Sequence, residues 1–263
     1  MKKYYKILRI LLRNSYIRDS KIPGYVLSSL AFNVVEITFT IVFFNVIFNN
    51  TQSLAGWNFY QILFLYMVAK IVTSVNATFT RNGINAMSEE LIRRGGLDIY
   101  LTRPVDPMIL VSLSKPRIYG LLSVIFEIGL AIYALGHTGY HYGIANIIFF
   151  FLMFALSFIL FYLLRWVTVM PTFWFIRLYS LRDLMGKFNQ FMRYPAGIFP
   201  SVLKYALFVF FPILAISYIP ARTLFYQPKI EFIIYMFLAT FIFGIITKLL
   251  WQAGLKHYGS ASS

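Results

Sequence analysis

The chain has 263 residues, of which 59% are hydrophobic and 13% are charged, and its mean hydropathy is +0.70. A soluble domain has about 45–50% apolar and about 25% charged residues, so this composition indicates a lipid bilayer as solvent and excludes the soluble enzyme classes. At about 20 apolar residues per crossing, the length allows roughly six spans and no separate soluble domain. We therefore expect an all-α polytopic membrane protein with one domain over residues 1–263.

The formal net charge of +15 comes from 24 Lys and Arg against 9 Asp and Glu. These charges lie between apolar runs, as the positive-inside rule and anionic membrane lipids require, so we expect lipid contacts and no nucleic-acid partner. The chain has no cysteine, and His137, His141 and His257 form no metal-ligand motif. We expect no metal and no bound cofactor.

Residues 1–21 are strongly basic, with seven Lys and Arg. The spacing of Lys2, Lys6, Arg9 and Arg13 places them on one helical face, opposite an apolar face. This pattern predicts an amphipathic helix in the inner headgroup layer, and the simpler alternative is a basic flank of the first span. Both readings make the N-terminus cytoplasmic.

Apolar runs separated by polar segments predict six spans. Pro171 is expected to break the fourth run, and the fifth span is the least apolar. This arrangement puts 19 Lys and Arg on the inner side of the membrane and four, including Arg193, on the outer side. By the positive-inside rule we expect both termini in the cytoplasm, and we expect the protein in the plasma membrane of a bacterial cell. The predicted spans are Gly24–Phe48, Phe59–Thr80, Ile118–Leu135, Ile144 to about Ile176, Leu181–Gly197 and Glu231–Trp251.

Five of the ten prolines lie between residues 181 and 228, which rules out an uninterrupted helix there. We expect residues 198–228, with Pro200, Pro212 and Pro220, to form short re-entrant helices that enter the membrane from outside without crossing it.

Three ionisable residues lie deep within apolar runs: Glu36, Lys70 and Glu127. At 1.5 Å per residue they lie about 18, 16 and 14 Å from the inner ends of their spans. A lone charge at such a depth is unfavourable by a few kcal/mol or more, so the similar depths predict a Glu36–Lys70 pair, with Glu127 beside it. The charges either fix the helix register or line a proton or substrate path.

The chain carries no phosphate-binding P-loop, no G-x-S-x-G, no H-E-x-x-H and no paired aspartates facing a cavity. We expect no enzyme activity, so any energy for transport has to come from another chain.

The longest polar stretch, residues 81–117, is expected to be cytoplasmic. A short helix begins near Ser88, the Gly95-Gly96 break follows, and a second short helix, Leu97–Leu101, stops before Pro104. Exposed apolar residues at 99–101 would suit a knob that inserts into a partner's groove.

The strings Gly96-Leu97-Asp98 and Leu101-Thr102-Arg103-Pro104-Val105-Asp106-Pro107 resemble the cytoplasmic loop of bacterial ABC transporter permeases of the type-2 exporter class, in the subfamily with a G-x-L-D…L-x-R-P-x-x-P loop. Later landmarks of that family follow in order over residues 1–262. They are Phe173-Trp174, Tyr194-Pro195, Pro200, Pro212, Tyr218-Ile219-Pro220-Ala221, Trp251, Leu255, Tyr258 and Ser260-Ala261-Ser262. Lys70, in the second span, departs from the family pattern.

The resemblance implies a permease whose loop between spans two and three forms a coupling helix on a separate ATPase subunit, which would bind ATP-Mg. Two permease chains, identical or paralogous, would form the pathway. The residues implied in coupling are Gly96, Leu97, Asp98, Tyr100, Leu101, Arg103 and Pro104.

Two other functions are compatible with the sequence: a self-sufficient secondary transporter or channel that uses Glu36, Lys70 and Glu127, and a membrane assembly factor without transport. The sequence indicates neither the substrate nor the choice between homodimer and heterodimer.

Overall fold

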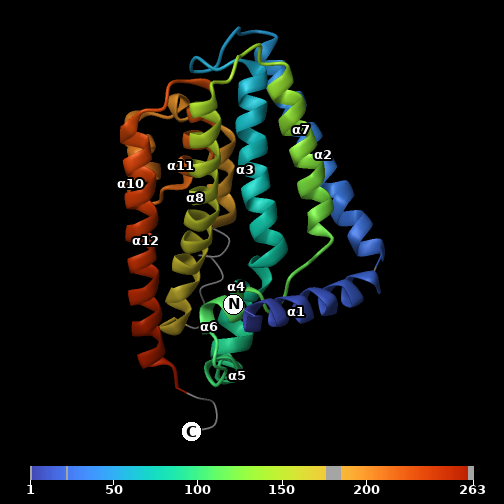
Figure 1. Ribbon diagram of the computed structural model, residues 1–263, viewed down its shortest axis with the longest axis vertical. Coiled ribbons are helices and arrows are strands. Elements are labelled where there is room, and N and C mark those ends of the chain that lie inside the picture. The colour runs from blue at the N-terminus through green and yellow to red at the C-terminus, as the bar shows by residue number, and fades with distance from the viewer. Residues whose placement is uncertain (1, 22, 176–184, 260–263) are drawn as a thin grey trace.

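The computed structural model describes residues 2–21, 23–175 and 185–259. These residues form helices and loops, with no strand beyond one isolated bridge between Leu54 and Trp57. Long helices run between two ends of a bundle (Figure 1), and the end that carries the segment between α3 and α7 is called the α5 end below. The long helices are α2 (Pro23–Phe48), α3 (Phe59–Phe79), α7 (Gly120–Gly136), α8 (Ile144–Val169) and α12 (Ile230–His257).

Four helices of the described residues are long and apolar enough to cross a membrane. They are Val26–Phe48 within α2, α3, the continuous run of α8 and the 3-10 helix η2 (Met170–Phe173), and α12. The count is five if α10 (Ser201–Val209) and α11 (Ile213–Phe225), which meet at a bend of 97°, are one span. The apolar α7 has 17 residues and a length of about 26 Å. The expected all-helical, multi-span architecture is present, and the count of six stays a prediction.

The fifth predicted span, Leu181–Gly197, is not a continuous α-helix where the structure describes it. Residues 181–184 lie outside the described residues, and residues 185–188 form one helical turn. Two 3-10 helices follow, η3 (Asn189–Arg193) and η4 (Ala196–Ile198), with an extended backbone at Tyr194. Pro195 explains the break, because a proline disfavours the helical conformation of the residue before it.

The proline-rich segment forms α10 and α11, and Pro200 and Pro212 directly precede them. Pro220 lies inside α11. The last carbonyl groups of a helix have no partner within it, and water does not reach them inside a bilayer. Asn146 of α8 meets this need, because its Nδ2 atom donates to the carbonyls of Thr223, Leu224 and Tyr226 at 3.1–3.2 Å. The bend fits the expected re-entrant segment or a broken span.

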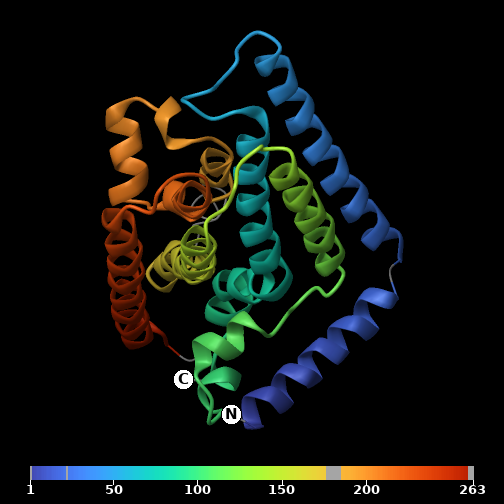
Figure 2. The ribbon, with the colours of Figure 1, turned by 45° about the horizontal axis from the view of Figure 1, so that its top comes forward.

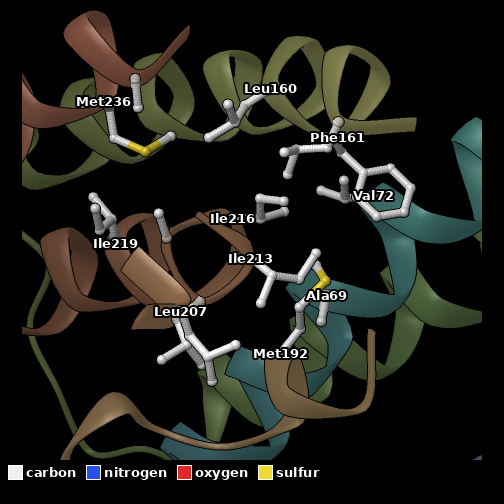
Figure 3. Packing of buried hydrophobic residues seen from close by; sticks show 14 of the residues in the cluster. Ala69, Val72, Leu160, Phe161, Met192, Leu207, Ile213, Ile216, Ile219 and Met236 are labelled. Carbon is white, nitrogen blue, oxygen red and sulfur yellow. The ribbon is translucent and has the colours of Figure 1, made fainter. Parts of the chain in front are cut away.

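Helix α3 lies at the centre of the bundle, with α7 and α2 on one side and α8, α11 and α12 on the other (Figures 1 and 2). Its first half is almost fully buried, in contrast to the largely exposed α2, α8 and α12. Figure 3 shows the packing of α11 against its neighbours. The residues at this contact are Ile213, Ile216 and Ile219 of α11, Ala69 and Val72 of α3, Leu160 and Phe161 of α8, and Met236 of α12.

Helix α1 (Lys2–Ser20) lies crosswise to α2 at the α5 end, in both ribbon views. Its last two turns are fixed to the chain before α7. Ser15 Oγ and the Arg18 guanidinium donate to the carbonyl of Pro116, and Asp19 Oδ2 accepts from the backbone N–H of Ile118 at 3.1 Å. The predicted N-terminal helix is therefore present, and its place in the headgroup layer stays a prediction.

The segment between α3 and α7, called the α5 segment below, folds into four short helices at the α5 end. They are α4 (Arg81–Ala86), the π-helical η1 (Met87–Arg93), α5 (Asp98–Leu101) and α6 (Pro107–Ser112). The first and last of them meet at Gly83, where a Cβ atom would lie 2.0 Å from the carbonyl oxygen of Val111. Only glycine permits this approach.

We predict that Gly83→Ala lowers the apparent melting temperature of the purified protein in detergent. The added methyl group meets backbone rather than a flexible side chain, and such overpacking destabilises by about 1–3 kcal/mol. The matched control is Gly129→Ala in α7, where the new Cβ has no neighbour within 4 Å, so stability should be unchanged or slightly higher. Equal melting temperatures for both variants would contradict the close α4–α6 contact.

Candidate functional site

Four charged side chains meet at mid-height of the bundle. Lys70 Nζ of α3 lies 3.0 Å from Glu36 Oε2 of α2 and 3.8 Å from Glu127 Oε1 of α7. Arg193 of η3 forms an ion pair with the other oxygen of Glu36. The pair expected from equal depth is thus present, with Glu127 beside it. This group of four is called the charge network below.

Glu127 is the most enclosed member of the charge network, with no exposed side-chain surface. Ser74 Oγ and Asn33 Nδ2 donate to its Oε1 atom at 2.7 and 3.2 Å. A buried charge persists only when ion pairs and hydrogen bonds replace its hydration. The network therefore joins α2, α3 and α7 through polar contacts within an apolar bundle.

Arg193 was expected at the outer end, and the structure corrects that placement to the interior. The sequence does not indicate the interior position of Arg193, because an arginine that follows apolar residues and precedes a Tyr-Pro pair is equally typical of a loop. Its position follows from η3, which is a 3-10 helix rather than an α-helix. Ser217 Oγ of α11 holds this helix by donating to the carbonyl of Met192 at 2.7 Å. Its guanidinium also lies over the ring of Tyr66, 5.5 Å from the centroid.

A cavity of about 890 Å³ extends from the charge network toward the α5 end. It lies between α2, α3, α4, the beginning of α7, α8 and residues 186–193. Polar side chains make up most of its lining, whereas the outer faces of the same helices are apolar. A polar cavity within apolar spans is where a membrane protein places a substrate or ion.

The residues implied in coupling lie together at the α5 end, but not as a fully exposed knob. Leu97 is fully buried, and Tyr100 and Leu101 are half-buried. In α5 only Ile99 is an exposed apolar side chain, at 60% exposure, and Arg103 and Pro104 after the helix are also exposed. The expectation of three exposed residues at 99–101 is therefore wrong for Tyr100 and Leu101.

Two glycines permit the tight turn before α5. Gly95 has a positive φ of 70°, and a Cβ atom at Gly96 would lie 2.8 Å from the carbonyl oxygen of Glu90. The turn carries Leu97 back under η1, where it packs into a buried cluster with Leu91. The hydrophobic effect favours burial of the Leu97 side chain in this cluster. The spacing of residues within this short segment does not predict it.

Aromatic residues join the α5 segment to α8 and α12. Trp166 and Phe173 lie against Trp251, with ring centroids 5.6 and 5.8 Å apart. Trp166 Nε1 donates to Ser112 Oγ of α6 at 3.1 Å. Trp166 is fully buried in the same cluster as Leu97, and no local sequence pattern marks it as part of this contact.

Tyr258, directly after α12, also reaches the α5 segment. Burial and the nearby Asp98 carboxylate raise the pKa of Tyr258. The α5 segment is thus packed against α8 and the end of α12.

The predicted absence of a metal site stays an expectation, and the described residues contain no group of three or more His, Cys, Asp or Glu that would hold a metal ion. Among the landmarks of the resemblance, Ser260-Ala261-Ser262 lie outside the described residues.

A family model described as ABC-2 family transporter protein matches residues 34–262. The chain belongs to this family. The match covers the charge network, the α5 segment and the cavity apart from Ser29, Phe32 and Asn33. The ABC-2 protein is thus a membrane component of a transporter with several apolar helices. No curated protein and no solved structure matches the chain.

We predict unequal rescue within the charge network. Lys70→Met alone leaves Glu36 with Arg193 but removes the cation nearest Glu127, so it should lower the melting temperature strongly; breaking a buried pair is unfavourable by about 3–5 kcal/mol. Adding Glu127→Gln should recover more stability than adding Glu36→Gln. The measurement is a pair of double-mutant cycles in detergent. Equal recovery in both cycles, or none, would contradict this distribution of contacts.

Proposed function

We propose that this ABC-2 protein is the permease subunit of an ATP-driven exporter in the plasma membrane, working with a separate ATPase and a second permease chain, identical or paralogous. The family match carries the proposal, and the α5 segment supports it. ATP-Mg would bind to the ATPase, because the sequence has no phosphate-binding loop of its own.

The α5 segment suits a mechanical contact with the ATPase. Ile99 of α5 is exposed, whereas Leu97 beside it is buried. Leu97 belongs to the buried cluster that includes Trp166 of α8 and Trp251 of α12. When the two ATPase subunits close on ATP, they would displace the α5 segment, and α8 and α12 would move with it. Arg103 and Asp98 would lie near the rim of the ATPase groove.

We predict that Ile99→Asp reduces co-purification of the ATPase or uncouples ATP hydrolysis from transport, because it places a charge in the apolar contact. The permease should remain folded, since the side chain is exposed. Ile144→Asp at the opposite end makes the same change at an exposed isoleucine and should leave coupling intact. Normal coupled transport by the Ile99 variant would remove α5 as the contact. Tyr100 and Leu101 are poorer test sites, because their substitution also disturbs packing.

The α5 end is proposed to face the cytoplasm, with both termini on that side. With Arg193 in the interior, three Lys and Arg of the described residues remain at the outer end: Lys204, Arg222 and Lys229. The large excess of positive charge at the α5 end gives this orientation by the positive-inside rule.

We predict that Ser53→Cys reacts with an impermeant thiol reagent in intact cells and that Thr102→Cys reacts only after the membrane is opened. Both positions are exposed, at opposite ends of the bundle, and the natural chain has no cysteine to give background. Labelling of Thr102→Cys from outside intact cells would reverse the proposed topology.

A self-sufficient secondary transporter is the second candidate, favoured by the contact of Lys70 with both carboxylates beside a polar cavity. Transport assays in liposomes separate the two functions. The exporter requires the ATPase and ATP, whereas the secondary transporter moves its substrate at full rate with a proton gradient alone.

A further inference from the structure

The loop between α2 and α3, at the end of the bundle opposite α5, contains a tight hairpin (Figure 1). Leu54 and Trp57 exchange two backbone hydrogen bonds, with N–H donors at 2.9 and 3.1 Å from the carbonyl oxygens. Between them, Ala55 and Gly56 have positive φ angles of 52° and 81°. Positive φ at both central residues is typical of a two-residue turn of type I′. Residues 54–57 are called the hairpin below.

Ala55 has an unfavourable backbone conformation. Among the described residues it is the only one other than glycine with a positive φ, and a Cβ atom disfavours that conformation. A glycine at this position would be free of the strain, but it would lack the methyl group. That methyl group has a neighbour in η4, because a Cβ atom at Gly197 would lie 3.0 Å from the Ala55 Cβ. Strained residues cluster at switch regions, where the surrounding structure holds them.

The remainder of the hairpin is anchored to the end of α11. The Tyr226 hydroxyl donates to the carbonyl of Gly56 at 3.1 Å. Three aromatic rings surround the buried ring of Trp57 at centroid distances of 5.8 Å: Tyr218, Phe225 and Tyr226. The contact between Ala55 and Gly197, in contrast, joins two exposed residues. The hairpin is therefore held firmly by α11 and lightly by η4.

The segment of η3 and η4 is suited to move as a unit. Its two 3-10 helices are separated by extended backbone at Tyr194 and Pro195, and 3-10 hydrogen bonds have poorer geometry than those of an α-helix. Three contacts join this segment to α2 and the hairpin, from mid-height outward: Glu36–Arg193, Phe44–Tyr194 and Ala55–Gly197. These three contacts are called the seam below.

Apolar packing closes the rest of the outer half. Every residue of α3 from 61 to 69, on the outer side of Lys70, is buried. Large apolar clusters join α3 to α7 and α8 to α11 and α12. The seam, in contrast, is one ion pair, one edge-to-face pair of rings and one methyl contact. Its separation would therefore break less apolar packing than separation of these helices.

We propose that the segment of η3 and η4 is the movable wall of the outer half and that Ala55 is its latch. In the structure Ala55 holds Gly197, and the seam is closed. When a substrate leaves the charge network toward the outer end, Gly197 moves away from Ala55 and the seam opens along α2. The inference rests on the proposed function, because it locates the opening of a transport protein, but it does not depend on the source of energy.

The test follows a cysteine placed behind the seam. Thr73→Cys lies one turn farther toward the α5 end than Lys70, lines the cavity and is the only thiol of the chain. Intact cells that produce the full chain are treated with a small membrane-impermeant methanethiosulfonate, and modification of residue 73 is measured by peptide mass spectrometry. When opening is fast, the rate of such a reaction follows the population of the open form. The control reporter is Ser53→Cys, which is exposed at the outer end and should react equally in every background.

The first background, Ala55→Gly, removes the methyl contact and the backbone strain together. We expect an unchanged or slightly higher melting temperature, because glycine adopts positive φ readily. Thr73→Cys should nevertheless react about fivefold or more faster, because the open form is more populated. A residue with a merely structural role would not combine unchanged stability with faster access. An unchanged or slower reaction of residue 73 in this background overturns the latch.

The second background, Ala55→Cys/Gly197→Cys, closes the seam covalently. The Cβ separation of 3.0 Å is within about 1 Å of the usual value in a disulfide, so oxidation should join the two residues. Modification of residue 73 should then be about tenfold or more slower, and it should recover after reduction with dithiothreitol and removal of the reductant. The two single-cysteine variants with the same oxidant are the controls. An unchanged rate in the oxidised pair overturns the proposal, as does the absence of modification from outside in every background.

If the double-cysteine variant does not fold, Ala55→Gly alone decides the outcome. The same comparison with the purified chain in liposomes omits the ATPase and ATP. Faster modification of residue 73 in Ala55→Gly there supports the latch for either kind of transporter. Failure of this inference is therefore distinguishable from failure of the exporter proposal, which the coupling assay with Ile99→Asp tests.

Discussion

The ion pairs among Glu36, Lys70, Glu127 and Arg193 are the contacts on which the arrangement of the bundle depends. Inside a bilayer each charge would be strongly unfavourable alone, so no one of the four side chains is tolerated without its partners. Helix α2 also packs against the bundle through Ile37 and Phe44, but most of its surface is exposed, so the network adds the polar contacts that set its height and rotation against α3 and η3.

The cavity and the α5 segment share a structural element, although their chemistry differs. Asn85 of α4 lines the cavity and holds Arg165 of α8, and η1 begins two residues after it. Gly83 holds the same short helix against α6. Helix α4 therefore links the α5 segment to the wall of the cavity.

Residue spacing sufficed for the features that depend on local sequence. The ends of α2 and α3 lie within a residue of the predicted ends, the α-helix α8 stops just before Pro171, and the depths of Glu36 and Lys70 predicted their contact. Spacing failed where tertiary packing decides. Arg193 reaches the interior only because η3 is not an α-helix, and Leu97 turns inward because the aromatic cluster of α8 and α12 offers a buried site.

The π-helical turn of η1 holds one residue more than the α-helix that would otherwise form. Because the wide turn absorbs that residue, the chain before it and the chain after it face as they would across a regular α-helix with one residue fewer. Deleting one residue between Met87 and Arg93 would therefore close this segment into an α-helix and leave Leu97 in its buried site and Ile99 exposed. The wide turn thus gives the segment a residue that it can lose without moving a packed side chain out of register.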